Sequence, residues 1–411
     1  MKKIFLIAIL SLIFSCKIEK KSQKTDNKTK SLAVNSKTDS KEFYKKQVTN
    51  AVNQLSLLLN DSEKAGKNPR TIDKNGEIHW THEKFDWTEG FFPGSLWYIY
   101  KYTNDKKYKK GAEEIQKNFE KHKLLKTNHD LGFVFNNSYG NGYKLTKNKE
   151  YKDVLVAAAN SLITRYNKDV GCIKSWDVDR GWQSKRNWKF PVIIDNMMNL
   201  ELLFEVSKLT DDNKYKEIAI HHANTTLKNH FRSDYSSYHV IDYDPETGEV
   251  RGKQTAQGFA DSSAWARGQA WGIYGYTVCY RYTKDEKYLK QAEKIADFII
   301  NHKDLPEDGI PYWDFSENRS YKNLRDVSAA TVTLSALIEL EEYSKKDYSN
   351  YINKVFKSLA SSQYTAALGE NKNFVLKHSV GSIPHNNEID VPLNYADYYY
   401  IEALSRKLNI K

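Results

Sequence analysis

A six-residue pattern recurs four times along the chain, and it constrains the possible folds more than any other feature of the sequence. Each copy begins with Thr, has Asp or Asn in third place and ends with Tyr. The copies lie at 103–108, 146–151, 210–215 and 283–288, with a degenerate copy at 344–348. Apolar residues at helical spacing precede and follow each copy, and its polar residues can cap a new helix. The pattern therefore predicts a chain built from helical hairpins.

The copies are unevenly spaced, which argues against a regular solenoid. With an opening helix near 41–59 and a closing helix at 394–406, the apolar periodicity predicts about a dozen helices. A closed ring of hairpins, an (α/α) toroid, would bury their apolar faces and leave the long connections free to carry a site. The segment 237–250 reads as a small β-hairpin insert. We expect an all-α fold with one catalytic domain over residues 42–411.

The N-terminus has the layout of a lipoprotein export signal. Residues 1–16 contain two lysines, an apolar run too short to anchor the chain in a bilayer, and Ser15-Cys16. The run before Cys16 resembles a bacterial lipobox, in which the cysteine is lipidated after cleavage. Residues 17–41 are almost all polar and are expected to form a disordered tether. We therefore expect a cell-envelope lipoprotein, facing the periplasm or on the outer-membrane surface, with its lipid anchor as its only membrane contact.

The charge of the chain does not favour nucleic acid as a partner. Residues 1–46 hold 12 Lys and 4 acidic residues, so most of the net charge of +11 belongs to the leader and tether. The 28 Tyr and 9 Trp suit flat sugar rings as well as ordinary packing. The 11 His are scattered, and no metal-binding or nucleotide-binding motif is visible, so we expect neither metal nor cofactor. Cys172 and Cys279 are expected to be two separate buried thiols.

Two acidic residues lie in apolar surroundings. Asp195 follows Phe190-Pro-Val-Ile-Ile194, and Asp130 lies in His129-Asp-Leu-Gly-Phe133. Asp195 can be read as the N-cap of a helix, or as a carboxyl that burial keeps protonated for chemistry. Two partly buried carboxyls at different helix starts are common equipment for general acid and base work on sugars. An ionised Asp130 nearby would raise the pKa of Asp195 further.

A set of eight motifs in this chain resembles the unsaturated glucuronyl hydrolases, glycoside hydrolase family 88. The motifs keep their order and cover nearly everything after the tether, so the set is far more specific than any single member. They are 87–97 (WTEGFFPGSLW), 129–133, 194–200 (IDNMMNL), 238–240, 265–271 (WARGQAW), 325–330, 378–382 (HSVGS) and 390–399.

The resemblance implies an (α/α)6 barrel acting on anionic oligosaccharides, sulfated or not, whose non-reducing uronic acid has a C4=C5 double bond. Polysaccharide lyases make such ends from glycosaminoglycans or ulvan. By similarity Asp195 is the acid/base and Asp130 its partner carboxyl. The residues that by similarity bind the substrate are Trp87, His129, Trp176, His239, Gln257, Arg267, Trp271, Ser379 and Ser382, with Trp182 as an alternative to Trp176.

Other readings stay open from the sequence. An unsaturated rhamnogalacturonyl hydrolase shares the barrel and the chemistry, and a surface glycan-binding lipoprotein shares the aromatic residues without the reaction. A toroid-shaped epimerase or a hydrolase of saturated chains is also compatible with the composition. The helix face of Arg267 and Trp271 also reads as core-facing. The insert 177–187, with Arg180, Lys185 and Arg186, is either a sulfate contact or a solvated loop.

Overall fold

The computed structural model describes residues 22–81, 84–315 and 323–410. The chain divides into two compact units, one up to Lys46 and one from Gln47 onward. Helix α1 (Ser22–Ala65) runs through this boundary. The predicted signal peptide and Cys16 lie outside the described residues. Of the segment 17–41, residues 22–41 belong to α1, which contains no Gly or Pro.

An inner ring of helices forms the centre of the second unit. Neighbouring members contact one another, and α12 contacts α2, so the ring is closed. Its members are buried on nearly all sides, as expected for helices surrounded by other helices. They are α2 (Phe91–Thr103), the π-helix η2 (Gly132–Gly140) with α4 (Asn141–Thr146), the 3-10 helix η4 (Ile194–Asn199) with α6 (Leu200–Thr210), α8 (Ala266–Thr283), α10 (Val327–Leu340) and α12 (Asn394–Lys407).

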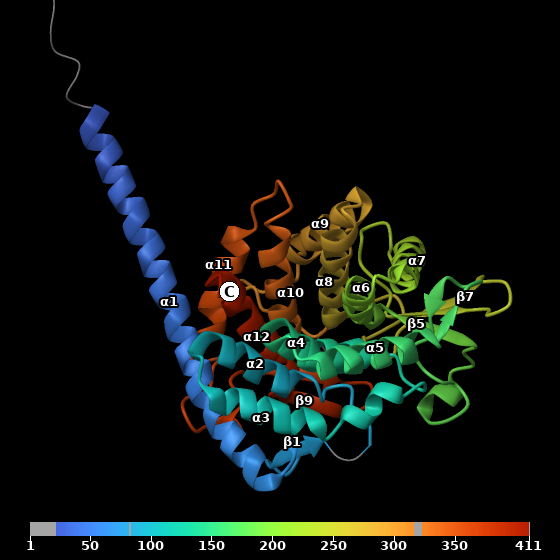
Figure 1. Cartoon of the computed structure of the whole chain (residues 1–411). Helices are drawn as coiled ribbons and strands as arrows, with labels where there is room; N and C mark the ends of the chain where they lie inside the picture. The colour runs from blue at the N-terminus through green and yellow to red at the C-terminus, as the bar shows by residue number, and fades with distance from the viewer. Residues whose placement is uncertain (1–21, 82–83, 316–322, 411) are drawn as a thin grey trace, which may run out of the picture. The chain divides into compact units, whose positions relative to one another are not determined.

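An outer layer of helices covers this ring, and each member buries one apolar stripe. In α9 the stripe consists of Leu289, Ala292, Ile295 and Ile299, while Lys and Glu face outward. The outer helices are α1 from Gln47 onward, α3 (Lys106–Lys117), α5 (Lys149–Ile163), α7 (Asn213–Asn229), α9 (Glu286–Asn301) and α11 (Ser349–Leu359). Over the described ranges, six inner and six outer helices make an (α/α)6 barrel (Figure 1), which confirms the predicted fold class.

The recurring six-residue pattern forms the turns between inner and outer helices. Four inner helices end at a residue in the left-handed conformation, Asn104, Lys147, Asp211 and Lys284. The next residue caps the outer helix through its side chain, as Asp105 does by accepting a hydrogen bond from the backbone N–H of Lys107 at 3.0 Å. Asn148, Asp212 and Asp285 make the same contact. These short turns lie at one end of the barrel. The prediction that the repeated pattern marks helical hairpins is therefore confirmed.

The strands lie at the other end of the barrel, in the long connections that lead into the inner helices. They form four small antiparallel sheets, and the predicted hairpin is the second half of a three-stranded one. The pairs are β1 (Asn68–Ile72) with β2 (Ile78–Thr81), β3 (Tyr166–Asn167) with β4 (Cys172–Ile173), β5 (Phe190–Ile193) with β6 (Val240–Tyr243) and β7 (Val250–Gln254), and β8 (Ser379–Ser382) with β9 (Asn387–Val391). Short 3-10 helices η1 (Glu120–Leu124), η3 (Trp182–Lys185) and η5 (Asn371–Asn373) complete the connections.

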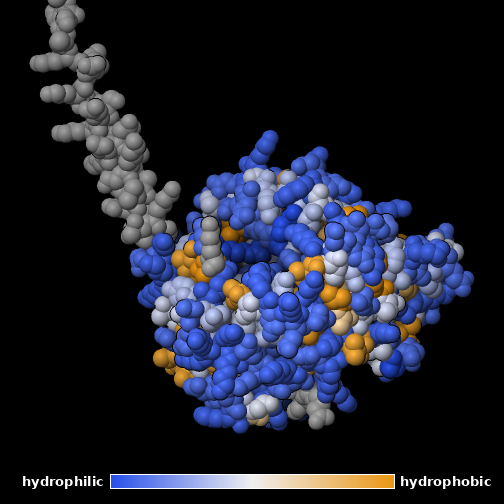
Figure 2. Space-filling view, in the orientation of Figure 1, coloured by the Kyte–Doolittle hydropathy of each residue, from blue (hydrophilic) through white to orange (hydrophobic). Residues whose placement is uncertain are grey.

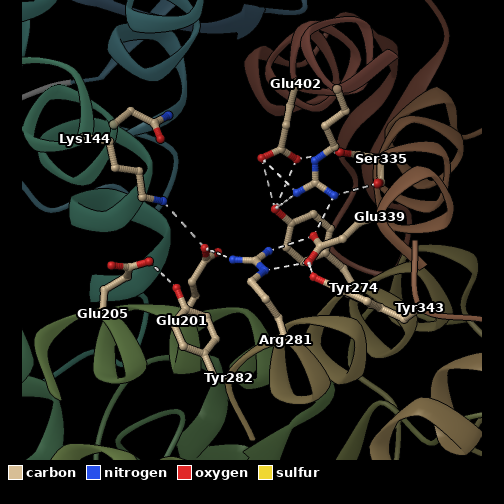
Figure 3. Close-up of polar contacts among 12 residues, drawn as sticks. Lys144, Glu201, Glu205, Tyr274, Arg281, Tyr282, Ser335, Glu339, Tyr343 and Glu402 are labelled. Atoms are coloured by element: carbon tan, nitrogen blue, oxygen red, sulfur yellow. Dashed lines mark hydrogen bonds and ion pairs between the residues drawn. The ribbon is translucent and has the colours of Figure 1, made fainter. Parts of the chain in front are cut away.

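A largely buried network of charges joins the inner helices α6, α8, α10 and α12 (Figure 3). Arg281 on α8 contacts Glu201 on α6 at 2.7 Å and Glu339 on α10 at 2.6 Å. Arg406 on α12 contacts Glu339 at 2.8 Å and Glu402 at 3.4 Å. Arg281 lies fourteen residues beyond Arg267 on α8, which is about 21 Å along the helix axis. The network therefore ties four inner helices together far from the strand-bearing end.

One face of the protein is mainly polar, and the two described thiols do not pair with each other. The face shown in Figure 2 is mainly hydrophilic, with its hydrophobic residues scattered over it. Among the described helices, none combines the length and the apolar character that crossing a membrane requires. Cys172 and Cys279 are buried and unpaired with each other, so the prediction of two separate thiols is confirmed.

Candidate active site

A cavity of about 510 Å³ opens at the strand-bearing end of the barrel. Its wall is built where the inner helices begin, because the long connections deliver their last residues to that end. The wall combines carboxylates, an arginine pair, amides and aromatic rings, which suits a polar ligand with flat faces. Its residues are Arg70, Trp87, Asp130, Phe133, Trp176, Trp182, Ile193, Asp195, Gln257, Arg267, Gly381, Ser382, His385, Asn386, Asn387, Glu388 and Tyr395.

Asp195 reaches the cavity from the first turn of η4, directly after strand β5. The helix cap is Ile193, with no side-chain hydrogen bond, so Asp195 is not an N-cap as the alternative reading proposed. Its side chain is buried, and Oδ2 has no hydrogen-bond partner among the described residues. A buried carboxylate oxygen without a partner is costly unless a ligand or water supplies a donor. The position therefore favours contact with a ligand.

Asp130 lines the same cavity and lies two residues before the start of the π-helix η2. Its backbone N–H is held by Oδ1 of Asn128 at 2.9 Å. The close approach of η2 and η4 depends on Gly132, since a Cβ there would lie 2.4 Å from the Cα of Asn199. Burial raises the pKa of Asp130 well above its usual range, and the negative charge of Asp195 adds to this effect.

His239 lies beside Asp195, with its Nε2 atom 3.5 Å from Oδ2. Its Nδ1 atom accepts hydrogen bonds from the backbone N–H groups of Ala256 at 3.0 Å and Gln257 at 3.1 Å. A nitrogen that accepts two N–H donors carries no proton, so the ring is the neutral tautomer with its proton on Nε2. The Nε2–H group has no acceptor closer than Asp195. His239 therefore presents a donor to the carboxylate side of the cavity.

His129 is fully buried behind the wall, with Nε2 3.1 Å from Oδ1 of Asp130. Burial lowers the pKa of His129 well below its usual range, and the positive charge of Arg165 lowers it further. The imidazole is therefore neutral, and the contact with Asp130 is not an ion pair. The structure places His129 against Asp130 rather than on the cavity wall.

Arg267 lines the cavity from the first turn of α8 and is almost completely buried. Its Nη1 atom contacts Asp326 at 3.0 Å and the carbonyl oxygen of Val380, and its Nη2 donates to the carbonyl oxygen of Gly381 at 2.7 Å. These contacts join α8, α10 and β8 around the site. The two terminal nitrogens of this guanidinium are therefore largely used within the protein, while Nε has no partner among the described residues.

Trp271 and Ser379 lie deeper than predicted. Trp271 is one helical turn beyond Arg267, a rise of about 5.4 Å into the barrel, and its ring packs on Phe133 at 5.1 Å. Ser379 is fully buried at the start of β8. Neither residue is part of the cavity wall, because Phe133 and Gly381 stand in front of them. Their Nε1 and Oγ atoms are nevertheless buried without a partner.

The remaining predicted residues line the cavity. Trp87 forms one side, and Trp176 and Trp182 form another, with ring centroids 5.1 Å apart. Gln257 donates to the carbonyl oxygen of Gly381 at 3.3 Å, and Ser382 contacts Nδ1 of His385 at 2.7 Å. Both candidates for the stacking wall, Trp176 and Trp182, therefore contribute.

Unpartnered buried polar atoms gather around this cavity. Around the cavity, such atoms occur on His129, Asp195, His239, Arg267, Trp271, Ser379 and Tyr395, and others lie elsewhere in the described ranges. Most of these atoms are donors, on imidazole, guanidinium, indole and hydroxyl groups. Buried polar groups are normally paired, so such a concentration indicates the place of a ligand or ordered water. A donor-rich pocket favours ligands with carboxylate and hydroxyl groups.

Some wall residues had escaped prediction. Tyr395 begins α12, and its ring lies 4.9 Å from that of Trp87 and 5.4 Å from the guanidinium carbon of Arg267. Its position at the start of an inner helix was the available signal, shared with Asp195 and Arg267. Arg70 and Glu388 form a two-bond ion pair, Nε to Oε1 at 2.6 Å and Nη2 to Oε2 at 2.9 Å. They lie 318 residues apart, so no local pattern indicates the pair.

No group of three metal-binding side chains occurs in the part of the chain that the structure describes. Paired buried carboxyls, aromatic walls and unpaired donors at the open end of an (α/α)6 barrel define a carbohydrate-processing enzyme of the glycosidase class. The chain belongs to Glycosyl Hydrolase Family 88, which residues 62–406 match. The resemblance seen in the motifs is therefore confirmed.

Known relatives cover nearly the whole chain. An unsaturated glucuronyl hydrolase of Formosa agariphila is 44% identical over 414 residues, covering 100% of this chain and 99% of the relative. An unsaturated chondroitin disaccharide hydrolase of Streptococcus agalactiae is 30% identical, covering 91% and 93%. The crystal structure of an unsaturated glucuronyl hydrolase specific for heparin has a TM-score of 0.84 at 46% identity, covering 90% of this chain and 98% of that one. These relatives confirm the reading of this chain as an unsaturated glucuronyl hydrolase.

Proposed function

We propose that this chain removes the 4,5-unsaturated glucuronic acid from the non-reducing end of glycosaminoglycan-derived oligosaccharides, with Asp195 as the acid/base. The observation that carries the assignment is the meeting of Asp195 and Asp130 in one cavity surrounded by unpaired buried donors. Relatives that act on chondroitin disaccharides, and one specific for heparin, support the substrate class.

The first step is protonation of carbon. The C4=C5 bond is conjugated with the ring oxygen, so adding a proton to C4 leaves an oxocarbenium-like centre at C5. Burial raises the pKa of Asp130, and the negative charge of Asp195 raises it further, so the two carboxyls are electrostatically coupled. Asp195 lines the cavity, and we assign it as the acid that transfers a proton to C4. General acid catalysis of this kind contributes about 10²–10⁴-fold.

The second step is addition of water at C5. The carboxylate that has given up its proton accepts one from the attacking water, and the new C5–O bond makes a hemiketal. The hemiketal opens by breaking the bond from C5 to the ring oxygen. The former ring oxygen then belongs to a hemiacetal at C1, which releases the next sugar. The active site is thereby left with its original proton count.

The unpaired donors supply the grip on the uronic acid. The Nε–H group of Arg267 and the hydroxyl of Tyr395 are buried and have no hydrogen-bond partner among the described residues. Burial raises the pKa of Tyr395, so its hydroxyl keeps its proton and donates. A carboxylate or a ring hydroxyl of the substrate can accept hydrogen bonds from these donors. The bond from the charged guanidinium to a carboxylate is stronger than a bond between neutral groups. Trp87, Trp176 and Trp182 provide faces for the ring.

The test follows the proton. The protein is incubated in heavy water with unsaturated disaccharides derived from chondroitin, hyaluronan and heparin, and loss of absorbance from the conjugated acid reports turnover. We expect deuterium at C4 of the product and a loss of most turnover in Asp195→Asn with the fold retained. Turnover without deuterium at C4 contradicts the mechanism, and consumption of unsaturated galacturonyl oligomers alone identifies the rhamnogalacturonyl alternative. Equal consumption by Asp195→Asn excludes Asp195 as the acid/base.

We also propose that the mature protein is a lipoprotein of the cell envelope, anchored through Cys16. The support is the sequence of residues 1–16, with its lysines, short apolar run and Ser15-Cys16. Incorporation of labelled palmitate into the wild type but not into Cys16→Ala is the expected result. Equal labelling of both proteins contradicts it.

A further inference from the structure

A second hollow, of about 560 Å³, lies beside the cavity. Three segments each contribute to both. Helix η3 gives Trp182 to the cavity and its last residue, Lys185, to the second hollow. The turn between β8 and β9 gives His385 to the cavity and Pro384 to the hollow, and Gln257 lies on the cavity between two residues of the hollow. The two depressions are therefore neighbours along shared walls.

The boundary between them is aromatic. The rings of Trp182 and His385 have centroids 4.7 Å apart, and Trp182 packs on Trp188 at 5.7 Å. A sugar chain whose terminal ring occupies the cavity can cross this boundary by stacking on these faces. The sugar on the reducing side of the scissile bond, and the one after it, would then reach the second hollow.

The charges at the second hollow are mainly positive. Arg186 is fixed there, since its Nη2 atom donates to the carbonyl oxygen of Thr255 at 2.6 Å and its guanidinium carbon lies 4.9 Å from the ring of Trp188. The printed partners of Arg186 are the neutral oxygens of Gln254 and Thr255, and Lys185 is exposed. The one acidic residue on the wall, Asp261, accepts the backbone N–H of Thr255 at 2.7 Å.

The loop beneath the hollow is held rigidly. The side chain of Asp314 accepts from the backbone N–H of Phe259 at 2.8 Å and from Ser263 at 2.8 Å. His239 holds the backbone of the same loop from the cavity side. Because these backbone donors are already used, the side chains of Lys185 and Arg186 are the groups left to bind a ligand. A fixed guanidinium with free N–H groups loses little conformational entropy when it binds an anion.

We propose that this second hollow binds an anionic group, a sulfate ester or a uronate carboxylate, on the sugars at the reducing side of the scissile bond. The inference rests on the proposed function, because it takes the terminal unsaturated ring to occupy the cavity. It assigns to the insert 177–187 a role in substrate selection, through Lys185 and Arg186. Substrates that place an anion in the hollow gain binding without any change in the chemical step.

Three substrates distinguish the sources of the anion: an unsulfated unsaturated disaccharide, the same disaccharide sulfated on its second sugar, and an unsulfated tetrasaccharide with a second uronate. The test variant is Lys185→Ala combined with Arg186→Gln. For the substrate whose anion occupies the hollow, we expect KM to rise about tenfold and kcat to stay nearly unchanged. For the unsulfated disaccharide, both KM and kcat should stay nearly unchanged. A rise for the sulfated disaccharide identifies sulfate, and a rise for the tetrasaccharide alone identifies the carboxylate.

The control is Lys189→Ala, which removes one positive charge from the same stretch, at a residue that contacts Asp244 at 2.7 Å and lines neither depression. It should leave all three substrates unchanged. Binding of the same sugars to Asp195→Asn, measured by calorimetry with and without the double substitution, separates recognition from turnover. An equal effect of the double variant on all three substrates, or no effect on any, overturns the proposal. If the wild type binds the sugars but converts none, the proposed function fails instead.

Discussion

The Nε2 atom of His239 lies 3.5 Å from Oδ2 of Asp195, and the protein backbone fixes which nitrogen carries the proton. Because Nδ1 accepts from the N–H groups of Ala256 and Gln257, His239 can only donate toward Asp195. The ring is held in place between Trp176 and Trp265, with centroids at 5.9 and 4.7 Å. This contact orients the carboxylate of Asp195 in the cavity.

Two substitutions separate the roles of the two nitrogens of His239. In His239→Asn the amide oxygen can take the place of Nδ1 and keep the two backbone donors paired, while the donor toward Asp195 is lost. We expect the melting temperature to stay near that of the wild type and kcat to fall about tenfold, the value of one oriented hydrogen bond. In His239→Ala both roles are lost, so the melting temperature should fall as well. Equal kcat in the wild type and His239→Asn would show that the contact does not orient Asp195.

The pair of carboxyls makes a prediction about titration. The pKa of Asp130 is raised first by burial and then by the negative charge of Asp195. Replacing Asp195 by Asn removes that charge but leaves the burial, so the pKa of Asp130 should fall while staying above its usual range. Carbon-13 NMR of labelled aspartate carboxyls, compared between wild type and Asp195→Asn, measures the change. A pKa that rises or does not move would mean that the two carboxyls are not coupled.

The ion pair of Arg70 with Glu388, here called the clamp, joins the hairpin β1–β2 to the hairpin β8–β9. Removing it should affect both stability and substrate binding. Arg70 on β1 holds Glu388 at the start of β9 and also contacts Asp86 at 2.7 Å, with all three side chains largely buried. Arg70→Ala leaves two carboxylates unpaired, which costs about 3–5 kcal/mol of unfolding free energy. Because Glu388 lines the cavity, we also expect KM to rise.

The matched control for the clamp is Lys372→Ala. Its ion pair with Glu77, at 3.0 Å, is exposed and also joins sequence-distant segments. Exposed pairs contribute about 0–1 kcal/mol, so this variant should behave like the wild type in both measurements. Urea unfolding and steady-state kinetics give the two readouts. Similar losses in both variants would show that the buried clamp contributes no more than an exposed ion pair.

The sequence predicted those features that depend on local spacing. The turn pattern placed the hairpins because a cap at Asp105 or Asp285 acts within two residues of its own position. Asp195 and Asp130 could be found because each lies next to a short apolar run at a helix start. The location of the insert hairpin was also local, while its third strand β5 was not, since Ile193 pairs with Val240 across a long connection.

The other features of the site depend on how deeply each residue is buried and on contacts between residues far apart in the sequence. Local spacing of residue types does not encode either. Arg267 and Trp271 share a helix face, but the cavity ends between them because Phe133 fills the next layer. The free nitrogen of Arg267 follows from its contacts with carbonyl groups 113 and 114 residues away. The raised pKa of Asp130 follows first from its burial, which local sequence patterns do not specify.

Acid stability should depend on the buried charge network at the far end of the barrel. Burial opposes the ionisation of Glu339, but the charges of Arg281 and Arg406 outweigh it and lower the pKa of Glu339 to about 2. In the unfolded chain this carboxyl has an ordinary pKa near 4.5, so the folded state binds its proton less readily. The stabilisation is therefore fully present above about pH 4.5 and is lost as the pH falls toward 2, with a total of roughly 3 kcal/mol.

Glu339→Gln tests this dependence. The variant leaves Arg281 and Arg406 with one charged partner fewer, so its unfolding free energy at neutral pH should be lower. Between pH 4.5 and 2 the variant should lose less stability than the wild type, because the titrating group is gone. Urea unfolding at a series of pH values measures both effects, and Glu77→Gln, at an exposed pair, serves as the control. Parallel pH curves for the wild type and Glu339→Gln would show that other carboxyls carry the acid sensitivity.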